Sequence, residues 1–299
     1  MVKLASVRET RLYGPLRIRD QCEDANAGLY LVATLLLLVG CVLLLPGYHL
    51  VTVGLYLVLV ALFLIVVVNL HDLYAQLAGF DFRLPLVTLD PQLALIEIAA
   101  PLVQALGGIL YFMGTLLLLR VGRGAFDSDD VRTVTNHAYR LLIAGPLLWL
   151  LGSIHNAFQV YEKVDTKVQL LQKTVAIPFV IASTLFVISG ILAAENWPSP
   201  AAAIKIQRTA AALAIAASTL LVVAAIMNAI RIAGMQQIDR RGGSLEPLRG
   251  GAQEKLDHER EQKETLLDKQ KYAAPVDIEE GSSYKSAVVT AAEGLNEES

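Results

Sequence analysis

The chain has 299 residues, of which 55% are hydrophobic and 18% are charged, and its mean hydropathy is +0.51. These proportions lie on the membrane side of the averages for soluble globular domains. The net charge of -3 is small and indicates no nucleic-acid partner, and the two cysteines, Cys22 and Cys41, provide no disulfide framework.

Six long apolar runs predict an all-α membrane protein with six transmembrane helices. The clearest run extends from Leu50 to Leu70. At about 1.5 Å per residue, a helix of this length crosses a hydrocarbon core of about 30 Å. The runs lack the alternation of barrel strands, so helices must satisfy their backbone amides. The expected spans are approximately 28–45, 50–70, 93–119, 141–158, 174–194 and 209–230.

Polar segments flank and interrupt the six-span region 28–231. Residues 1–27 form a basic leader without the apolar core of a signal peptide, so we expect the first span to act as its own insertion signal. The charged segment 160–173 is expected to extend the fourth span as a solvated helix or to lie along the membrane surface. Residues 232–299 are rich in Glu, Lys, Gln, Gly and Ser and predict a mostly disordered tail.

The distribution of Lys and Arg predicts that both termini are cytosolic. An even number of spans puts both termini on one side of the membrane, together with the loops 71–92 and 159–173. Lys and Arg are concentrated on that side, and cytosolic segments carry the excess of positive charge. The basic loop from Arg120 to Arg140 lies on the opposite side and runs against this assignment. The sequence does not distinguish the plasma membrane from an endomembrane.

Three expected spans share a pattern of small and aromatic residues on one helical face. The pattern comprises Gly107, Tyr111, Gly114 and Thr115 in the third span, Gly145, Trp149, Gly152 and Ser153 in the fourth, and Ala182, Phe186, Ser189 and Gly190 in the fifth. Small residues let helix backbones approach closely in lipid. The alternative is that small residues are simply common in membrane helices. We expect helix-packing contacts at Gly107, Gly114, Gly145, Trp149, Gly152 and Ser153.

The stretch 136–197 carries this pattern twice, through Trp149 with Gly152 and Ser153 and through Phe186 with Gly190. In this respect it resembles the YrhK-like family of small multi-pass membrane domains, whose helices carry an aromatic residue followed by Gly-Ser. The fifth span departs from that order with Ser189 before Gly190. The longer chain looks like plant-type eukaryotic proteins that carry such a domain between additional spans. The resemblance implies no established activity and no functional residue.

Polar side chains inside the spans gather at the end that we expect to be cytosolic. Ionisable groups in lipid are costly and are candidates for function. They can form an interfacial hydrogen-bonded set, or line a cavity for an ion, proton or small solute, with carbonyls freed by Pro101, Pro146 and Pro178. A transition-metal site is the third interpretation, but the candidate residues show no HxxxH, HxxE or CxxC spacing among themselves, and we expect no cofactor. The candidate residues are Asn69, His71, Asp72, Glu97, His155 and Asn156.

The motifs of familiar enzymes are missing from the sequence. We find no Walker, Rossmann or deaminase motif. The sequence therefore favours a non-enzymatic structural or scaffolding component of a membrane complex. Its expected partners are the lipid bilayer and either a second copy of the chain or other membrane proteins. The alternative is a transporter or channel that uses the inner-leaflet polar residues.

Overall fold

The structure is a computed structural model that describes residues 16–47, 49–78, 99–157, 166–195 and 199–240. These residues form helices and no strands. The helices are α1 (Leu16–Leu43), α2 (Val51–Ala78), α5 (Ala100–Gly122), α6 (Ser128–Ala157), α7 (Thr166–Ala194) and α8 (Pro200–Arg240). Each contains a stretch that is long and apolar enough to cross a membrane. The predicted all-α fold with six spans is confirmed.

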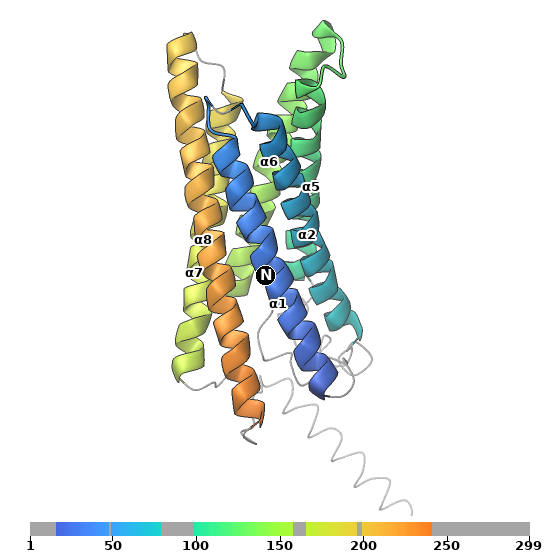
Figure 1. Ribbon diagram of the computed structural model, residues 1–299, viewed down its shortest axis with the longest axis vertical. Coiled ribbons are helices and arrows are strands. Elements are labelled where there is room, and N and C mark those ends of the chain that lie inside the picture. The colour runs from blue at the N-terminus through green and yellow to red at the C-terminus, as the bar shows by residue number, and fades with distance from the viewer. Residues whose placement is uncertain (1–15, 48, 79–98, 158–165, 196–198, 241–299) are drawn as a thin grey trace, which may run out of the picture. The chain divides into compact units, whose positions relative to one another are not determined.

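The six helices run up and down in chain order (Figure 1), and contacts between neighbouring helices close them into a ring. Each helix packs on the helices before and after it in the sequence, and α1 also packs on α8. The start of α1 and the end of α8 lie at the same end of this bundle, which we call the terminal end. The opposite end, where α1 leads into α2 and α7 leads into α8, is the hairpin end.

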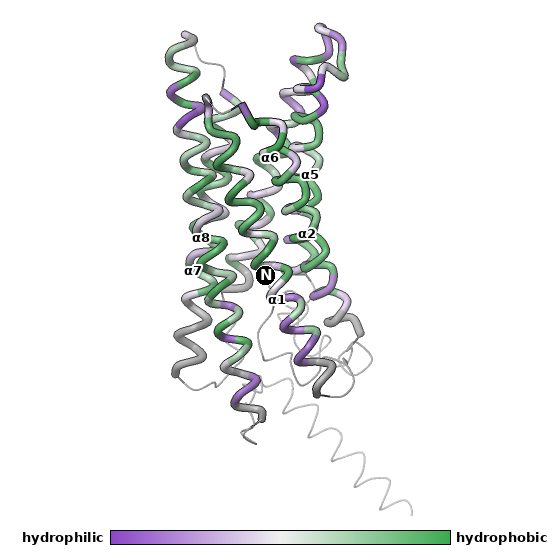
Figure 2. Tube along the Cα trace, viewed as in Figure 1, coloured by the Kyte–Doolittle hydropathy of each residue, from purple (hydrophilic) through white to green (hydrophobic). Residues whose placement is uncertain are grey.

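Apolar residues occupy the middle of the bundle, and polar residues gather toward its two ends (Figure 2). Large apolar side chains also face outward; Phe63 is 57% exposed and Ile177 is 56% exposed. A soluble bundle would turn such residues inward and present a polar face to water. This outer surface is the one that a membrane protein presents to lipid.

The helices extend beyond the apolar runs that predicted them. Residues 16–27, which the sequence analysis assigned to the leader, form the first turns of α1, and residues 232–240 form the last turns of α8. The segment 166–173 opens α7 and therefore extends the fifth span, so its assignment to the fourth span was wrong. A helix continues through polar residues because each added residue gains a backbone hydrogen bond, so hydropathy marks only the part in lipid. The tail beyond residue 240 lies outside the described residues, as does the loop 79–98.

Prolines do not divide the helices. Pro146 lies inside a continuous α6 and Pro178 inside a continuous α7. Pro101 lies in the first turn of α5, where its missing amide hydrogen has no helical partner to lose. The expectation that proline-broken helices line a cavity therefore has no support in the described helices.

Three aromatic residues meet at the centre of the bundle. Tyr111, Trp149 and Phe186 occupy equivalent positions of the sequence pattern on α5, α6 and α7. Their ring centroids lie 5.7 Å apart for Tyr111–Trp149, 5.7 Å for Tyr111–Phe186 and 6.2 Å for Trp149–Phe186, all edge to face. Such pairs contribute about 0.5–1.5 kcal/mol each beyond the area that they bury. We call these three residues the aromatic cluster; it shows that the sequence pattern is realised in three dimensions.

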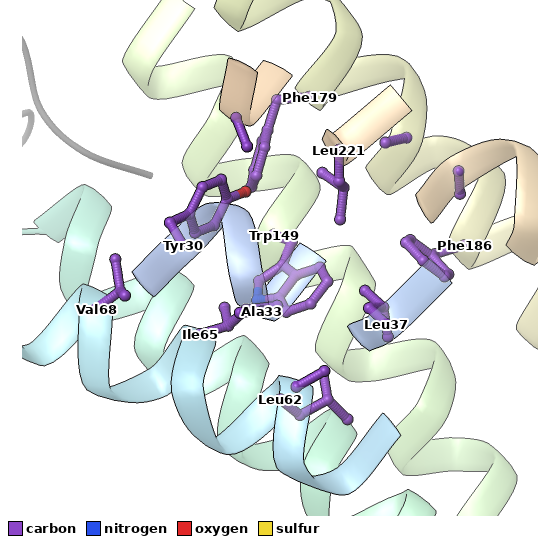
Figure 3. Close-up of a cluster of buried hydrophobic side chains, with 14 of the residues drawn as sticks. Tyr30, Ala33, Leu37, Leu62, Ile65, Val68, Trp149, Phe179, Phe186 and Leu221 are labelled. Carbon is purple, nitrogen blue, oxygen red and sulfur yellow. The ribbon is translucent and has the colours of Figure 1, made fainter. Parts of the chain in front are cut away.

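The aromatic cluster belongs to a larger apolar core (Figure 3). Trp149 is 1% exposed, and its indole Nε1 donates a hydrogen bond to the carbonyl oxygen of Gln104 at 3.0 Å. Leu37 on α1, Leu62 on α2 and Leu221 on α8 are buried in the same core. The core thus draws side chains from helices all around the ring.

Glycines allow neighbouring helices to approach closely. A Cβ built on Gly145 of α6 would lie 2.7 Å from the carbonyl oxygen of Gly107 and 2.8 Å from the amide nitrogen of Tyr111 on α5. These atoms belong to the backbone and cannot rotate away. Gly40 of α1 and Gly54 of α2 form a similar contact, in which each would place a Cβ 3.0 Å from the other's carbonyl oxygen. The sequence pattern missed this second contact because it lies outside the repeat.

We predict that Gly145→Ala destabilises the bundle. The added methyl group overlaps backbone atoms of α5, and overpacking of this kind costs about 1–3 kcal/mol. Thermal unfolding of the purified protein in detergent measures the effect.

Gly28→Ala is the matched control, because a Cβ at Gly28 meets no atom within 4 Å. Alanine in an exposed helical position should stabilise α1 by about 0.5–1 kcal/mol relative to glycine. Equal melting temperatures for the two variants would mean that α5 and α6 do not pack through Gly145.

The ring also predicts a topology. Because an even number of spans returns the chain to its starting side, tags placed before residue 1 and after residue 299 should lie on the same side of the membrane. The distribution of positive charge predicts the cytosolic side, so both tags should resist protease added to sealed cells. Cleavage of one tag alone would contradict the six-span ring, and cleavage of both would reverse the orientation.

Candidate functional site

The structure describes half of the polar residues that the sequence singled out. Asn69 and Asp72 near the end of α2 are buried, with 2% and 0% of their surface exposed, and His71 is half-buried. Glu97 lies outside the described residues, as do the side chains of His155 and Asn156. The solute-cavity and metal-site interpretations that need Glu97 and His155 therefore stay predictions.

Buried polar residues on α1 and α8 accompany those on α2. Like Asn69 and Asp72, they lie on the half of each helix nearer the terminal end. We call the combined set the polar cluster; it consists of Glu23, Asn26, Asn69, Asp72, Asn228, Arg231 and Gln236, each at most 6% exposed. The cluster contains two carboxylates and one guanidinium, and its three helices follow one another around the ring where the ring closes.

Hydrogen bonds link these three helices at the terminal end. The amide Nδ2 of Asn26 on α1 donates to the carboxylate Oδ1 of Asp72 on α2 at 2.8 Å. The amide Nε2 of Gln236 on α8 donates to Oδ1 of Asp24 on α1 at 2.9 Å and to the carbonyl oxygen of Asp20 at 3.3 Å. The first helix is therefore bonded to the second and to the last through side chains.

Burial increases the free-energy cost of losing any of these polar contacts. A charged or hydrogen-bonding side chain removed from water costs free energy unless a partner replaces the water. Partners in place stabilise the arrangement only modestly, but the loss of one partner leaves the other with the full cost of desolvation. Two chemical roles fit: the cluster holds α1 between α2 and α8, or its buried carboxylates exchange a proton or a cation.

The sequence analysis missed Glu23, Asn26 and Arg231 as interior residues. It assigned the first two to the leader and ended the sixth span at residue 230, directly before Arg231. A helical face extended backwards from the first span would have found two of them. Buried positions on α1 recur every three or four residues, and this series runs through Glu23, Asn26, Ala27, Tyr30, Ala33, Thr34, Leu37 and Cys41.

The predicted helix-packing residues lie between α5 and α6. Gly107 faces Gly145, as described above. A Cβ on Gly114 would lie 2.8 Å from the carbonyl oxygen of Ala138, and one on Gly152 would lie 2.8 Å from Cγ of Gln104. Ser153 is 1% exposed and donates a hydrogen bond to the carbonyl oxygen of Leu150 at 2.8 Å.

Comparison of the chain with protein-family models, curated proteins and solved structures found no match. The resemblance of residues 136–197 to YrhK-like domains gains no support from these comparisons and stays a prediction. The function must therefore be argued from the chain's own residues.

We predict that Asn26→Ala destabilises the protein, because it removes a buried donor from Asp72. Losing one partner of a buried charged group costs about 1–3 kcal/mol. Thermal unfolding in detergent should show this loss for Asn26→Ala, whereas Gln21→Ala at an exposed position on α1 should stay within about 0.5 kcal/mol of wild type.

A double-mutant cycle isolates the pair itself. Because Asn26 donates a hydrogen bond to Asp72, Asp72→Ala should cost less stability in the Asn26→Ala background than in wild type. Strictly additive effects of the two substitutions would show that these side chains do not interact.

Proposed function

We propose that the protein is a non-enzymatic structural component of a membrane assembly. The observation that carries this proposal is the packed centre of the helix ring. Trp149, Phe186, Leu37, Leu62 and Leu221 are each less than 2% exposed. A helix bundle that conducts a solute needs polar, hydrated surface through its middle. This layer is mainly aliphatic and aromatic, and the hydroxyls of its buried Thr34, Ser183 and Ser218 donate hydrogen bonds to carbonyl oxygens of their own helices.

The separation of polar groups along the bundle adds support. The polar cluster lies at the terminal end, and the aromatic cluster and its aliphatic neighbours lie beyond it toward the middle. Side-chain hydrogen bonds at the terminal end join the first, second and last helices, which suits a fixed bundle. The sequence of the tail, which is charged and poor in apolar residues, adds a segment suited to contacts with other proteins.

Proton or ion transport is the second candidate function. The observation that favours it is the burial of Glu23, Asp72 and Arg231 inside helical segments long enough to span a membrane. Charged residues at such positions are costly and often mark proton relays or ion pathways. In this alternative, one of the carboxylates is the group that takes up the proton or cation.

Reconstitution into liposomes distinguishes the two functions. With a pH gradient and a membrane potential imposed, vesicles that contain the protein should show the same proton and potassium flux as empty vesicles. Flux above the empty-vesicle level that Asp72→Asn abolishes would overturn the structural role and support transport. Asp130→Asn, at an exposed position on α6, is the matched control for loss of a carboxylate.

The structural role makes a second, positive prediction. Photo-crosslinking groups placed at the outward-facing Phe63 or Ile177 in native membranes should yield a discrete product of fixed mass, either with a second copy or with another membrane protein. A chain that crosslinks only to lipid from both positions would contradict membership in an assembly through these faces.

A further inference from the structure

A polar pocket opens at the hairpin end of the bundle, remote from the polar cluster. It has a volume of about 370 Å³ and lies between the start of α6, the end of α7 and the start of α8. This size is within the range of small-ligand sites, about 300–1,000 Å³. Its polar lining consists of Arg132, Thr135, Asn136, Tyr139, Glu195 and Gln207.

The packing of α7 explains why the pocket forms there. Gly190 lets α7 approach α6, since a Cβ at this position would lie 3.0 Å from Cγ1 of Ile143. One residue earlier, Ser189 Oγ donates a hydrogen bond to the carbonyl oxygen of Ala210 on α8 at 2.8 Å. Beyond these two contacts, the apolar wall is built largely from alanines, including Ala193 and Ala203. Such small side chains leave the space between the three helices open.

The pocket presents both signs of charge to one ligand. Arg132 is exposed on α6 and Glu195 is exposed after the last turn of α7. Guanidinium groups bind phosphate or carboxylate oxygens through paired hydrogen bonds. A carboxylate accepts hydrogen bonds from an ammonium group, and the lining also includes Tyr139, whose aromatic side chain is of a type that binds cations. A zwitterion can therefore pair its anionic group with Arg132 and its ammonium group with Glu195.

The pocket lies near the ends of three candidate membrane spans, where we infer one membrane surface to be. The candidate span of α7 ends at Ala194, that of α8 begins at Ala201, and that of α6 begins at Ser128. Phospholipid headgroups occupy this depth. Ile188 and Ile191 on α7 and Ile204 on α8 are between 41% and 48% exposed and offer an apolar surface to acyl chains nearby.

We propose that this pocket binds the headgroup of a zwitterionic phospholipid, with its phosphate at Arg132 and its ammonium group at Glu195 and Tyr139. The same chemistry would suit a soluble zwitterion. The lipid is favoured because the pocket lies at the headgroup level beside outward-facing isoleucines. The proposal also gives Arg132 a role on the side of the membrane where the distribution of positive charge predicted few basic residues.

Lipid binding by the full-length protein in detergent tests the proposal. Native mass spectrometry should show that delipidated wild-type protein retains phosphatidylethanolamine more tightly than phosphatidylglycerol, which has the phosphate but no ammonium group. Arg132→Gln should weaken phosphatidylethanolamine binding about tenfold, because it removes a charged donor. Glu195→Gln should abolish the preference for phosphatidylethanolamine over phosphatidylglycerol. Both positions are exposed, so the melting temperature should stay near that of wild type.

Matched controls separate this site from general charge effects. Arg120→Gln and Asp130→Asn change exposed charges near the same end of the bundle but outside the pocket, and should leave lipid retention unchanged. Equal retention of the two lipids by wild type, or equal losses in the pocket and control variants, would overturn the proposal. Displacement of the lipid by stoichiometric glycerophosphoethanolamine would overturn the lipid as occupant and assign the site to a soluble zwitterion.

Discussion

Gly107 and Gly145 have no side chains, and the backbones of α5 and α6 touch where these glycines face each other. Much of the interior depends on this contact. With the two helices this close, Trp149 on α6 reaches the carbonyl oxygen of Gln104 on α5, and its ring meets that of Tyr111. Phe186 of α7 then completes the aromatic cluster. A side chain at either glycine would separate the helices and shift the aromatic residues that fill the centre.

The closure of the ring requires a second kind of interaction. The contact between α1 and α8 joins the two ends of the six-helix series, and no short loop connects these helices. Lipid tails are as apolar as leucine, so apolar side chains gain no hydrophobic free energy when they leave lipid to contact each other. Close packing and hydrogen bonds therefore decide which helices associate. Gln236 bonds α8 to α1, and Asn26 bonds α1 to α2. The same buried polar residues are the basis of the transport alternative, since burial makes them costly in either role.

Hydropathy and spacing predict the secondary structure and part of the packing. The six spans follow from run length, and the small-aromatic pattern identifies the faces of α5, α6 and α7 that turn inward. These patterns do not identify which helix packs against each inward face. That α1 lies against α8, so that Arg231 is buried, depends on contacts between segments about two hundred residues apart. The hydropathy pattern also begins the first span only at Gly28, because Glu23 and Asn26 are polar and therefore count as solvent-facing. In the structure, the buried face of α1 continues through both residues.

The pocket at the hairpin end could not be predicted from the sequence, for a related reason. Arg132, Glu195 and Gln207 lie on three helices, and nothing in their spacing brings them together. The pocket exists because alanines near the ends of α7 and α8 leave space unfilled, and the absence of a side chain gives no signal in a hydropathy pattern. The segment from Arg120 to Arg140 drew attention only as an exception to the expected distribution of positive charge. It was predicted to be a loop, but the structure places Arg120 in α5 and both Arg132 and Arg140 in α6.

The reactivity of Cys41 tests the packed centre most directly. This native thiol lies on α1, is 4% exposed and belongs to the apolar core, whereas Cys22 on the same helix is only half-buried near the terminal end. A charged methanethiosulfonate reagent needs water to reach a thiol. In the folded protein it should modify Cys22 and leave Cys41 unmodified until the bundle is denatured. Modification of Cys41 in the folded protein at a rate close to that of Cys22 would show that water reaches the middle of the ring, and would contradict the packed centre on which the structural role depends.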